Sequence, residues 1–111
     1  MGDQYVALVG DQVVGTMRIR LTGHVGVISR VAVRGEFRGR RIGSVLVEYA
    51  ENIMSRMGAS VIEIEVYGAV EQQLTFYERV GYTETGRLNR LGEEIVVMQK
   101  ELVESIMEDD D

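Results

Sequence analysis

The sequence predicts a mixed α/β fold whose elements follow the order ββ-β-α-β-α-ββ, with a parallel βαβ unit at the centre. Several short runs alternate apolar and polar residues, which is typical of strands with one buried face. One long run has the 3.6-residue period of an amphipathic helix, and it lies between two such strands. A chain of 111 residues suits one core. We therefore expect a single domain over residues 1–102.

The first three elements are predicted strands joined by short turns. Gln4–Val9 and Val13–Leu21 lie on either side of Gly10-Asp11-Gln12, and a Gly-Asp turn between such runs is typical of an antiparallel hairpin. Val25–Val33 follows as the third strand.

The central βαβ unit contains the clearest helical pattern in the chain, from Ile42 to Met57, and it ends at Gly58, which suits a left-handed C-terminal cap. Its apolar stripe comprises Ile42, Val45, Leu46, Tyr49, Ala50, Ile53, Met54 and Met57. Alternation returns over Ala59–Tyr67. Strands that flank one helix are expected to be parallel, with a right-handed crossover.

The remaining elements are a short helix and a strand pair. The helix is marked by Val70, Leu74 and Tyr77 and ends at Gly81. The strands are Tyr82–Arg87 and Glu94–Leu102, joined across Asn89–Gly92. Residues 103–111 form an acidic tail, which we expect to be disordered because its like charges repel.

Composition excludes several classes of site. The chain has no cysteine and a single histidine, His24, so we expect no disulfide, no thiol nucleophile and no metal site. No apolar run approaches the ~20 residues of a membrane helix, and the first residues do not resemble a signal peptide. The net charge of −6 argues against a nucleic-acid partner. We therefore expect a soluble, cytoplasmic protein without a membrane anchor.

The segment from Arg34 to Ser44, between the third strand and the long helix, contains three glycines and four arginines. A glycine-rich turn before a helix leaves backbone N–H groups without partners, and the helix dipole adds positive charge there. Such a site suits a phosphate or pyrophosphate. The alternative is an ordinary solvated loop whose arginines face water. The glycine spacing fits neither a dinucleotide-binding loop nor a P-loop.

The loop resembles the Arg/Gln-x-x-Gly-x-Gly/Ala signature of the GCN5-related N-acetyltransferase (GNAT) family. Val31-Ala32-Val33 matches the strand that enters the loop, and Arg38-Gly39-Arg40-Arg41-Ile42-Gly43 matches the loop itself. Arg41 replaces the family's middle glycine, and we expect it to need a right-handed backbone. Thr75–Tyr82 (TFYERVGY) resembles a second family motif, and together the likeness covers Gln4–Leu102. We expect a short member without the family's usual N-terminal strand and helices.

The resemblance implies an N-acetyltransferase that moves an acetyl group from acetyl-CoA to the primary amine of a small molecule or peptide. The implied coenzyme contacts are Val31, Ala32 and Val33 through their backbone, and Arg38, Gly39, Arg40, Arg41, Ile42, Gly43 and Ser44 at the pyrophosphate. Tyr77 is the implied catalytic residue, as a hydrogen-bond donor to the leaving thiolate; the alternative is a core tyrosine.

No general base is evident. The family often places a Glu or His where this chain has Val27 and Ser29. Glu63 and Glu65 are candidates through water, but the alternation favours a solvent-facing position for both. These departures leave a second hypothesis open, a catalytically weak CoA-binding or interaction module. An uncovered sheet edge predicts a homodimer.

Overall fold

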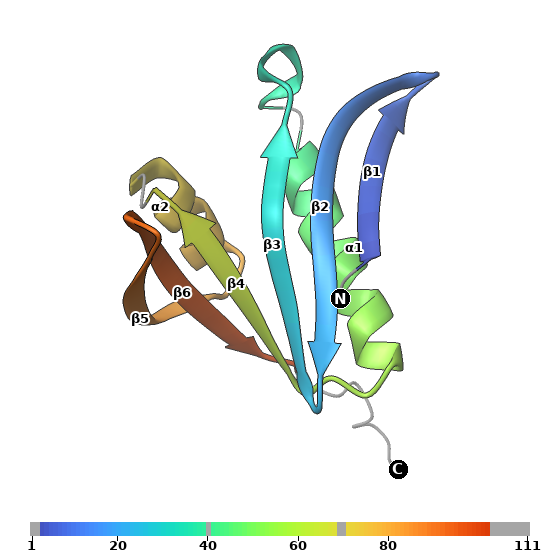
Figure 1. The fold of residues 1–111 in the computed structure, drawn as a ribbon. Helices are drawn as coiled ribbons and strands as arrows, with labels where there is room; N and C mark the ends of the chain where they lie inside the picture. The colour runs from blue at the N-terminus through green and yellow to red at the C-terminus, as the bar shows by residue number, and fades with distance from the viewer. Residues whose placement is uncertain (1–2, 40, 69–70, 103–111) are drawn as a thin grey trace.

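The computed structural model describes residues 3–39, 41–68 and 71–102. Six strands form one sheet in the order β1-β2-β3-β4-β6-β5 (Figure 1). The strands are β1 (Asp3–Val9), β2 (Gln12–Thr22), β3 (Val25–Val33), β4 (Val61–Tyr67), β5 (Thr83–Arg90) and β6 (Glu93–Glu101). The helices are α1 (Ile42–Arg56) and α2 (Glu71–Arg79), and a 3-10 turn spans Gly35–Phe37. The predicted mixed fold and its element order are confirmed.

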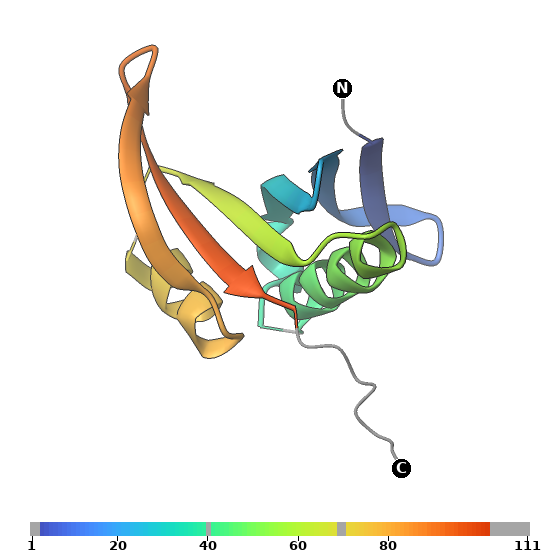
Figure 2. The same ribbon diagram turned by 90° about the horizontal axis from the view of Figure 1, so that it is seen from below.

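The central βαβ unit is also as predicted. β3 and β4 pair in parallel, and the other neighbouring strands pair antiparallel. Both helices lie on the same face of the sheet, α1 behind β2 and β3 and α2 behind β4 and β6 (Figures 1 and 2). The opposite face carries no helix within the described residues. None of the described helices has the length and apolar character to cross a membrane.

The core lies between the sheet and the two helices, and two glycines allow α1 to approach the strands closely. A Cβ at Gly26 would lie 2.5 Å from the Sδ of Met54, and one at Gly15 would lie 3.1 Å from a methyl carbon of Leu46. The first distance is too short for a Cβ unless Met54 moves, and the second is tighter than most Cβ contacts. The two glycines therefore favour a close approach of α1 to β2 and β3.

The predicted apolar stripe of α1 is partly wrong. Val45, Tyr49 and Met57 are 60%, 51% and 56% exposed, whereas Val47, which the stripe omitted, is 2% exposed. Val47 lies on the side of α1 where Val80 and Lys100 line a hollow with it. On the exposed side, the Tyr49 ring has an edge-to-face contact with Tyr5. Residues Val70 and 103–111, to which the sequence assigns a helix start and a tail, lie outside the described residues.

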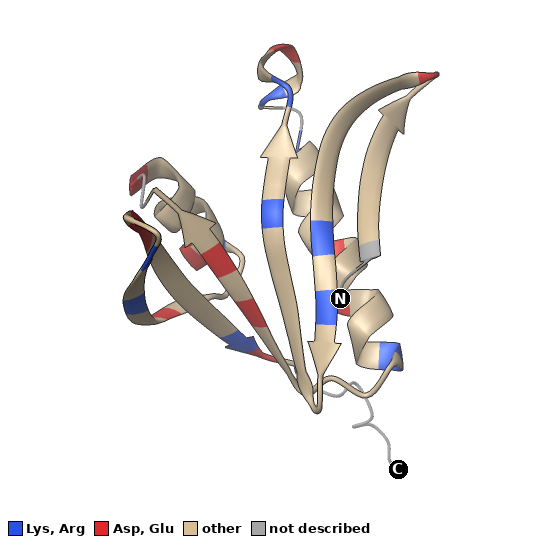
Figure 3. Ribbon diagram, viewed as in Figure 1, with Lys and Arg blue, Asp and Glu red and all other residues tan. Residues whose placement is uncertain are grey.

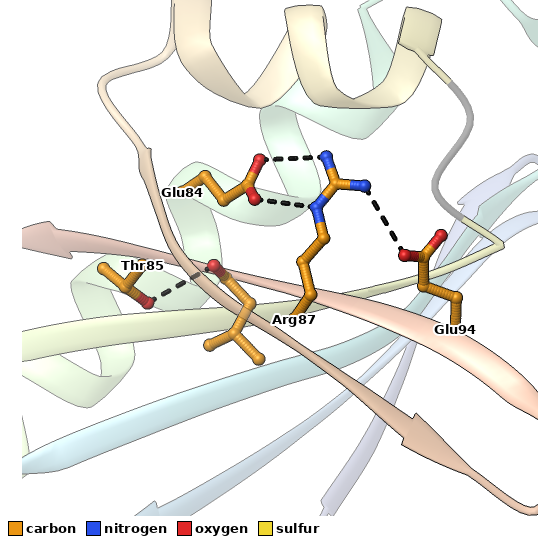
Figure 4. Close-up of polar contacts among 5 residues, drawn as sticks. Glu84, Thr85, Arg87 and Glu94 are labelled. Atoms are coloured by element: carbon orange, nitrogen blue, oxygen red, sulfur yellow. Dashed lines mark hydrogen bonds and ion pairs between the residues drawn. The ribbon is translucent and has the colours of Figure 1, made fainter.

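The β5–β6 hairpin is held by polar contacts on its exposed side (Figure 4). The Arg87 guanidinium donates to both carboxylate oxygens of Glu84, at 2.8 and 3.2 Å, and reaches Glu94 at 3.5 Å. The Thr85 hydroxyl donates to the carbonyl of Val97 at 3.3 Å, beside a bulge in β5. The hairpin turns at Leu91 and Gly92, both with positive φ, so β5 extends three residues beyond its predicted end.

Candidate functional site

The two parallel strands separate partway along their length and leave an open cleft. Pairing between β3 and β4 is confined to Val25–Ile28 against Val61–Ile64. Beyond that point the strands diverge (Figure 1). On its other side the end of β3 still pairs with β2, Thr16 opposite Ala32 and Gly15 opposite Val33. The backbone of Val31–Val33 therefore has one edge in the sheet and one edge facing the cleft, where β4 offers no ladder partner.

A β-bulge in β3 lies at the point of divergence. Two residues, Arg30 and Val31, oppose the single residue Met17 of β2. Arg30 has φ of 55°, a left-handed conformation that costs a residue with a Cβ about 1–2 kcal/mol. Sequence analysis missed this bulge, because Ser29-Arg30-Val31 contains no glycine to signal it. Such strain is concentrated at functional sites.

Tyr77 of α2 lies in the cleft, together with Val31 of β3. The cleft has a volume of about 210 Å³, and its lining includes Arg30, Glu65 and Tyr67. Tyr77 is 7% exposed, and its ring contacts those of Phe76 and Tyr82 edge-on. Its hydroxyl has no hydrogen-bond partner among the described residues. Burial raises the pKa of Tyr77 to about 12.

The two glutamates of β4 lie on the face opposite the buried Ile62, Ile64 and Val66, as alternation favours, but both are partly buried. The side chain of Glu65 is 10% exposed, lines the cleft and lies 3.8 Å from the Arg90 guanidinium. Glu63 accepts a hydrogen bond from the Gln99 side chain at 3.1 Å. The divergence of β3 from β4 opens a sheltered space beside Glu65, which a two-residue period cannot reveal. Val27 and Ser29 are buried.

The loop after β3 brings its glycines and arginines to the start of α1. The Nε of Arg38 donates to the carbonyl of Val33 at 3.3 Å, and Gly39 has φ of 83°. Arg41 has φ of 64°, so the expectation of a right-handed backbone at this position is wrong. Arg41 therefore has a Cβ in a strained, left-handed backbone. Arg40 lies outside the described residues.

The first turn of α1 presents amides without a side-chain cap from the described residues. These amides belong to Ile42, Gly43 and Ser44, and the helix dipole adds positive charge at this end. A Cβ at Gly43 would lie 3.7 Å from Phe76 and 3.9 Å from Val33, which is ordinary contact. The packing of the protein therefore does not require a glycine at this position. The same distances show that the helix start adjoins both the end of β3 and α2.

A polar cluster that sequence analysis missed lies behind Tyr77. The Tyr82 hydroxyl donates to Glu51 at 2.6 Å, and the Lys100 ammonium donates to the same carboxylate at 3.2 Å and to the Val80 carbonyl at 3.0 Å. Burial, followed by the Glu51 hydrogen bond, raises the pKa of Tyr82. The cluster joins α1, the end of α2 and β6, and it fixes the ring against which Tyr77 packs.

Known proteins share sequence and fold with this chain. Residues 2–82 match the sequence model of the Acetyltransferase (GNAT) family. A Bacillus subtilis (strain 168) protein, named provisionally as an acetyltransferase, is 33% identical over 69 residues. That match covers 62% of this chain and 45% of the relative, so the chain spans less than half of that protein's length.

Two solved structures show the same fold. An IAA acetyltransferase from Bacillus cereus ATCC 14579 has a TM-score of 0.79 and 22% identity, over 91% of this chain and 78% of its own. A GNAT family acetyltransferase from Elizabethkingia anophelis, solved with acetyl-CoA bound, has a TM-score of 0.78 and 18% identity, over 91% and 76% of the two chains. With more than half of its length matched by the family model, this chain belongs to the GNAT acetyltransferase family.

Proposed function

We propose that this protein transfers an acetyl group from acetyl-CoA to a primary amine in a ternary complex. One observation carries the proposal: the edge of β3 that faces the open cleft lies directly beside the first turn of α1, which has no side-chain cap from the described residues. A structural neighbour has acetyl-CoA bound, which supports the choice of co-substrate. The cytoplasmic location and the homodimer stay predictions.

Two groups of backbone atoms would hold the co-substrate. Val31, Ala32 and Val33 offer N–H and C=O groups to a pantetheine amide, in the manner of an added strand. The amides of Ile42, Gly43 and Ser44 suit the diphosphate, assisted by the positive side chains of Arg38 and Arg41. The bare Cα of Gly43 leaves room for a close approach.

Acetyl-CoA supplies an activated acyl group, its thioester. The neutral amine nitrogen forms the new C–N bond as the C–S bond breaks. A backbone N–H near Val31 would hold the developing oxyanion. The Tyr77 hydroxyl, which has no partner of its own in the described structure, would donate a hydrogen bond to the departing thiolate. With its pKa raised to about 12, Tyr77 stays protonated across neutral pH.

Glu65 is our candidate for receiving the amine proton, directly or through water. It lines the same cleft as Tyr77 and is largely shielded from solvent. A substrate ammonium has a reference pKa near 10 and must lose a proton before attack. Glu65 would therefore serve as the general base, a role that the side chains of Val27 and Ser29 cannot fill.

The proposal is tested by thiol release from acetyl-CoA over a panel of amines, together with a thermal shift against CoA. We expect CoA to raise the Tm and at least one amine to give turnover. A raised Tm without turnover on any amine would instead support the CoA-binding module. No change in Tm and no turnover would contradict both functions.

A further inference from the structure

The helix-free face of the sheet is divided by charge. Arg18 and Arg20 belong to β2, and Glu63 and Glu65 belong to β4. Basic positions on β2 and acidic positions on β4 appear as blue and red bands in Figure 3. The register places them on the same face, since Arg20 pairs with Val27 and Val27 with Glu63. Side chains of paired residues lie on one side of a sheet. The open cleft between β3 and β4 thus has a basic side and an acidic side.

A hollow on the basic side adjoins the cleft. It has a volume of about 430 Å³, and Thr16, Arg18, Arg30 and Glu93 are among its lining residues. Small-molecule pockets typically fall between about 300 and 1,000 Å³. The hollow shares Arg30 and Val31 with the cleft that contains Tyr77. A small molecule in the hollow can therefore extend into the cleft.

The two arginines of the hollow have no carboxylate partner within the described part of the chain. Arg87 and Arg90, by contrast, pair with Glu84 and Glu65. The Arg30 guanidinium lies 5.6 Å from the centre of the Tyr67 ring, a contact that holds it across the mouth of the cleft without neutralising it. Two unneutralised guanidinium groups that line one concave surface favour an oxyanion between them.

We infer that the amine acceptor also carries a carboxylate or phosphate group, and that Arg18 and Arg30 bind this group. The inference rests on the proposed acetyl transfer. An anion in the hollow directs the amine of the same molecule toward Val31 and Tyr77, past the residues that hollow and cleft share. Glu65 in the cleft and Glu93 at the wall of the hollow attract an ammonium. The acceptor is therefore a small zwitterion rather than a simple alkylamine.

The first test compares matched acceptors with the intact protein and saturating acetyl-CoA. One pair is an α-amino acid and its carboxamide; the other is phosphoethanolamine and ethanolamine. We expect the anionic member of at least one pair to have a kcat/KM about tenfold or more above that of its neutral partner, the range of a charged hydrogen bond. Which pair shows the preference identifies the anion.

Variants assign the preference to residues. Arg18→Gln and Arg30→Gln should reduce the anionic-to-neutral ratio toward one, and high salt should reduce it in the wild type. Arg30→Gly removes the same charge and suits the left-handed backbone, so it guards against misfolding of the bulge. Arg56→Gln is the control, because Arg56 is an exposed arginine at the far end of α1. It should leave the ratio unchanged.

Equal rates for both members of each pair would overturn the inference and leave the acetyltransferase standing. An unchanged ratio in Arg18→Gln and Arg30→Gly would do the same. If CoA raises the Tm but no amine turns over, the inference is tested by calorimetry. The measurement is the binding of the same amino acid and of phosphoethanolamine to the protein in the presence of CoA. Binding lost in Arg30→Gly supports the inference, and absence of binding overturns it. No thermal shift with CoA would instead mark failure of the proposed function.

Discussion

Tyr77 combines a buried ring with a hydroxyl that has no partner in the described structure. Tyr77→Phe keeps the ring and removes only the donor. We expect kcat to fall by about tenfold or more, because the thiolate loses its hydrogen bond, while CoA affinity changes little. Thiol-release kinetics and CoA titration measure the two effects. Unchanged kcat would reduce Tyr77 to a core residue.

The two buried tyrosines also predict how stability depends on pH. Burial raises the pKa of Tyr77 to about 12 and that of Tyr82 further, so the folded state keeps protons that the unfolded state releases near pH 10. Their contribution is complete below pH 10 and is lost as the pH rises, by on the order of 2–3 kcal/mol for Tyr77 by pH 12. Urea unfolding between pH 8 and 12 measures the slope.

Tyr77→Phe and Tyr82→Phe should each make that decline shallower, since a phenylalanine binds no proton in either state. A slope that is the same in the wild type and in both variants would show that neither tyrosine is desolvated in solution.

Sequence reasoning at the residue scale selects Tyr77 by its motif, offers Glu65 only as a less favoured candidate base, and gives no role to Arg30. Glu65 alternates like any surface residue, and only the divergence of β3 from β4 gives it a sheltered position. Arg30 has no sequence signal at all, because its left-handed backbone is imposed by the bulge rather than by a glycine. Both depend on contacts between strands distant in sequence.

At the scale of elements, the entry to α1 stores strain at Arg41, whose φ is 64°. Arg41→Gly should raise the free energy of unfolding by about 0.5–1 kcal/mol, because glycine adopts a positive φ without a Cβ clash. Arg56→Gly, in the last turn of the same helix, should instead lower it by about 1 kcal/mol. Urea unfolding of both variants measures the contrast, and a loss of stability in Arg41→Gly would contradict the strain.

The order and pairing of the elements could be predicted from local patterns, since alternation, the helical period and the central βαβ unit each follow from short stretches of sequence. The side of α1 that is buried could not be predicted from such local patterns. A period gives the width of an apolar stripe, but which flank is covered depends on the elements that pack there. Val47 is buried and Val45 is exposed.

At the scale of the whole molecule, we expect a substitution at Gly43 to change CoA binding and the stability of the fold in opposite directions. Gly43→Asp places a carboxylate in the first turn of α1, where the dipole and the loss of glycine flexibility should raise stability by about 0.5–1 kcal/mol. The same charge should repel a diphosphate and weaken CoA binding by about tenfold. Gly43→Ala is the control for the added Cβ, which meets only ordinary contacts. Unchanged CoA affinity in Gly43→Asp would place the diphosphate elsewhere.

Within the described residues, the fold brings together a strand edge without a ladder partner and a helix start without a side-chain cap at one end of the sheet. The most direct test of this pairing as the co-substrate site follows the backbone amides by NMR as CoA is added. We expect saturable shifts at Ile42, Gly43 and Ser44 and along Val31–Val33. Saturable shifts confined to other residues, or none in a folded protein, would contradict the account.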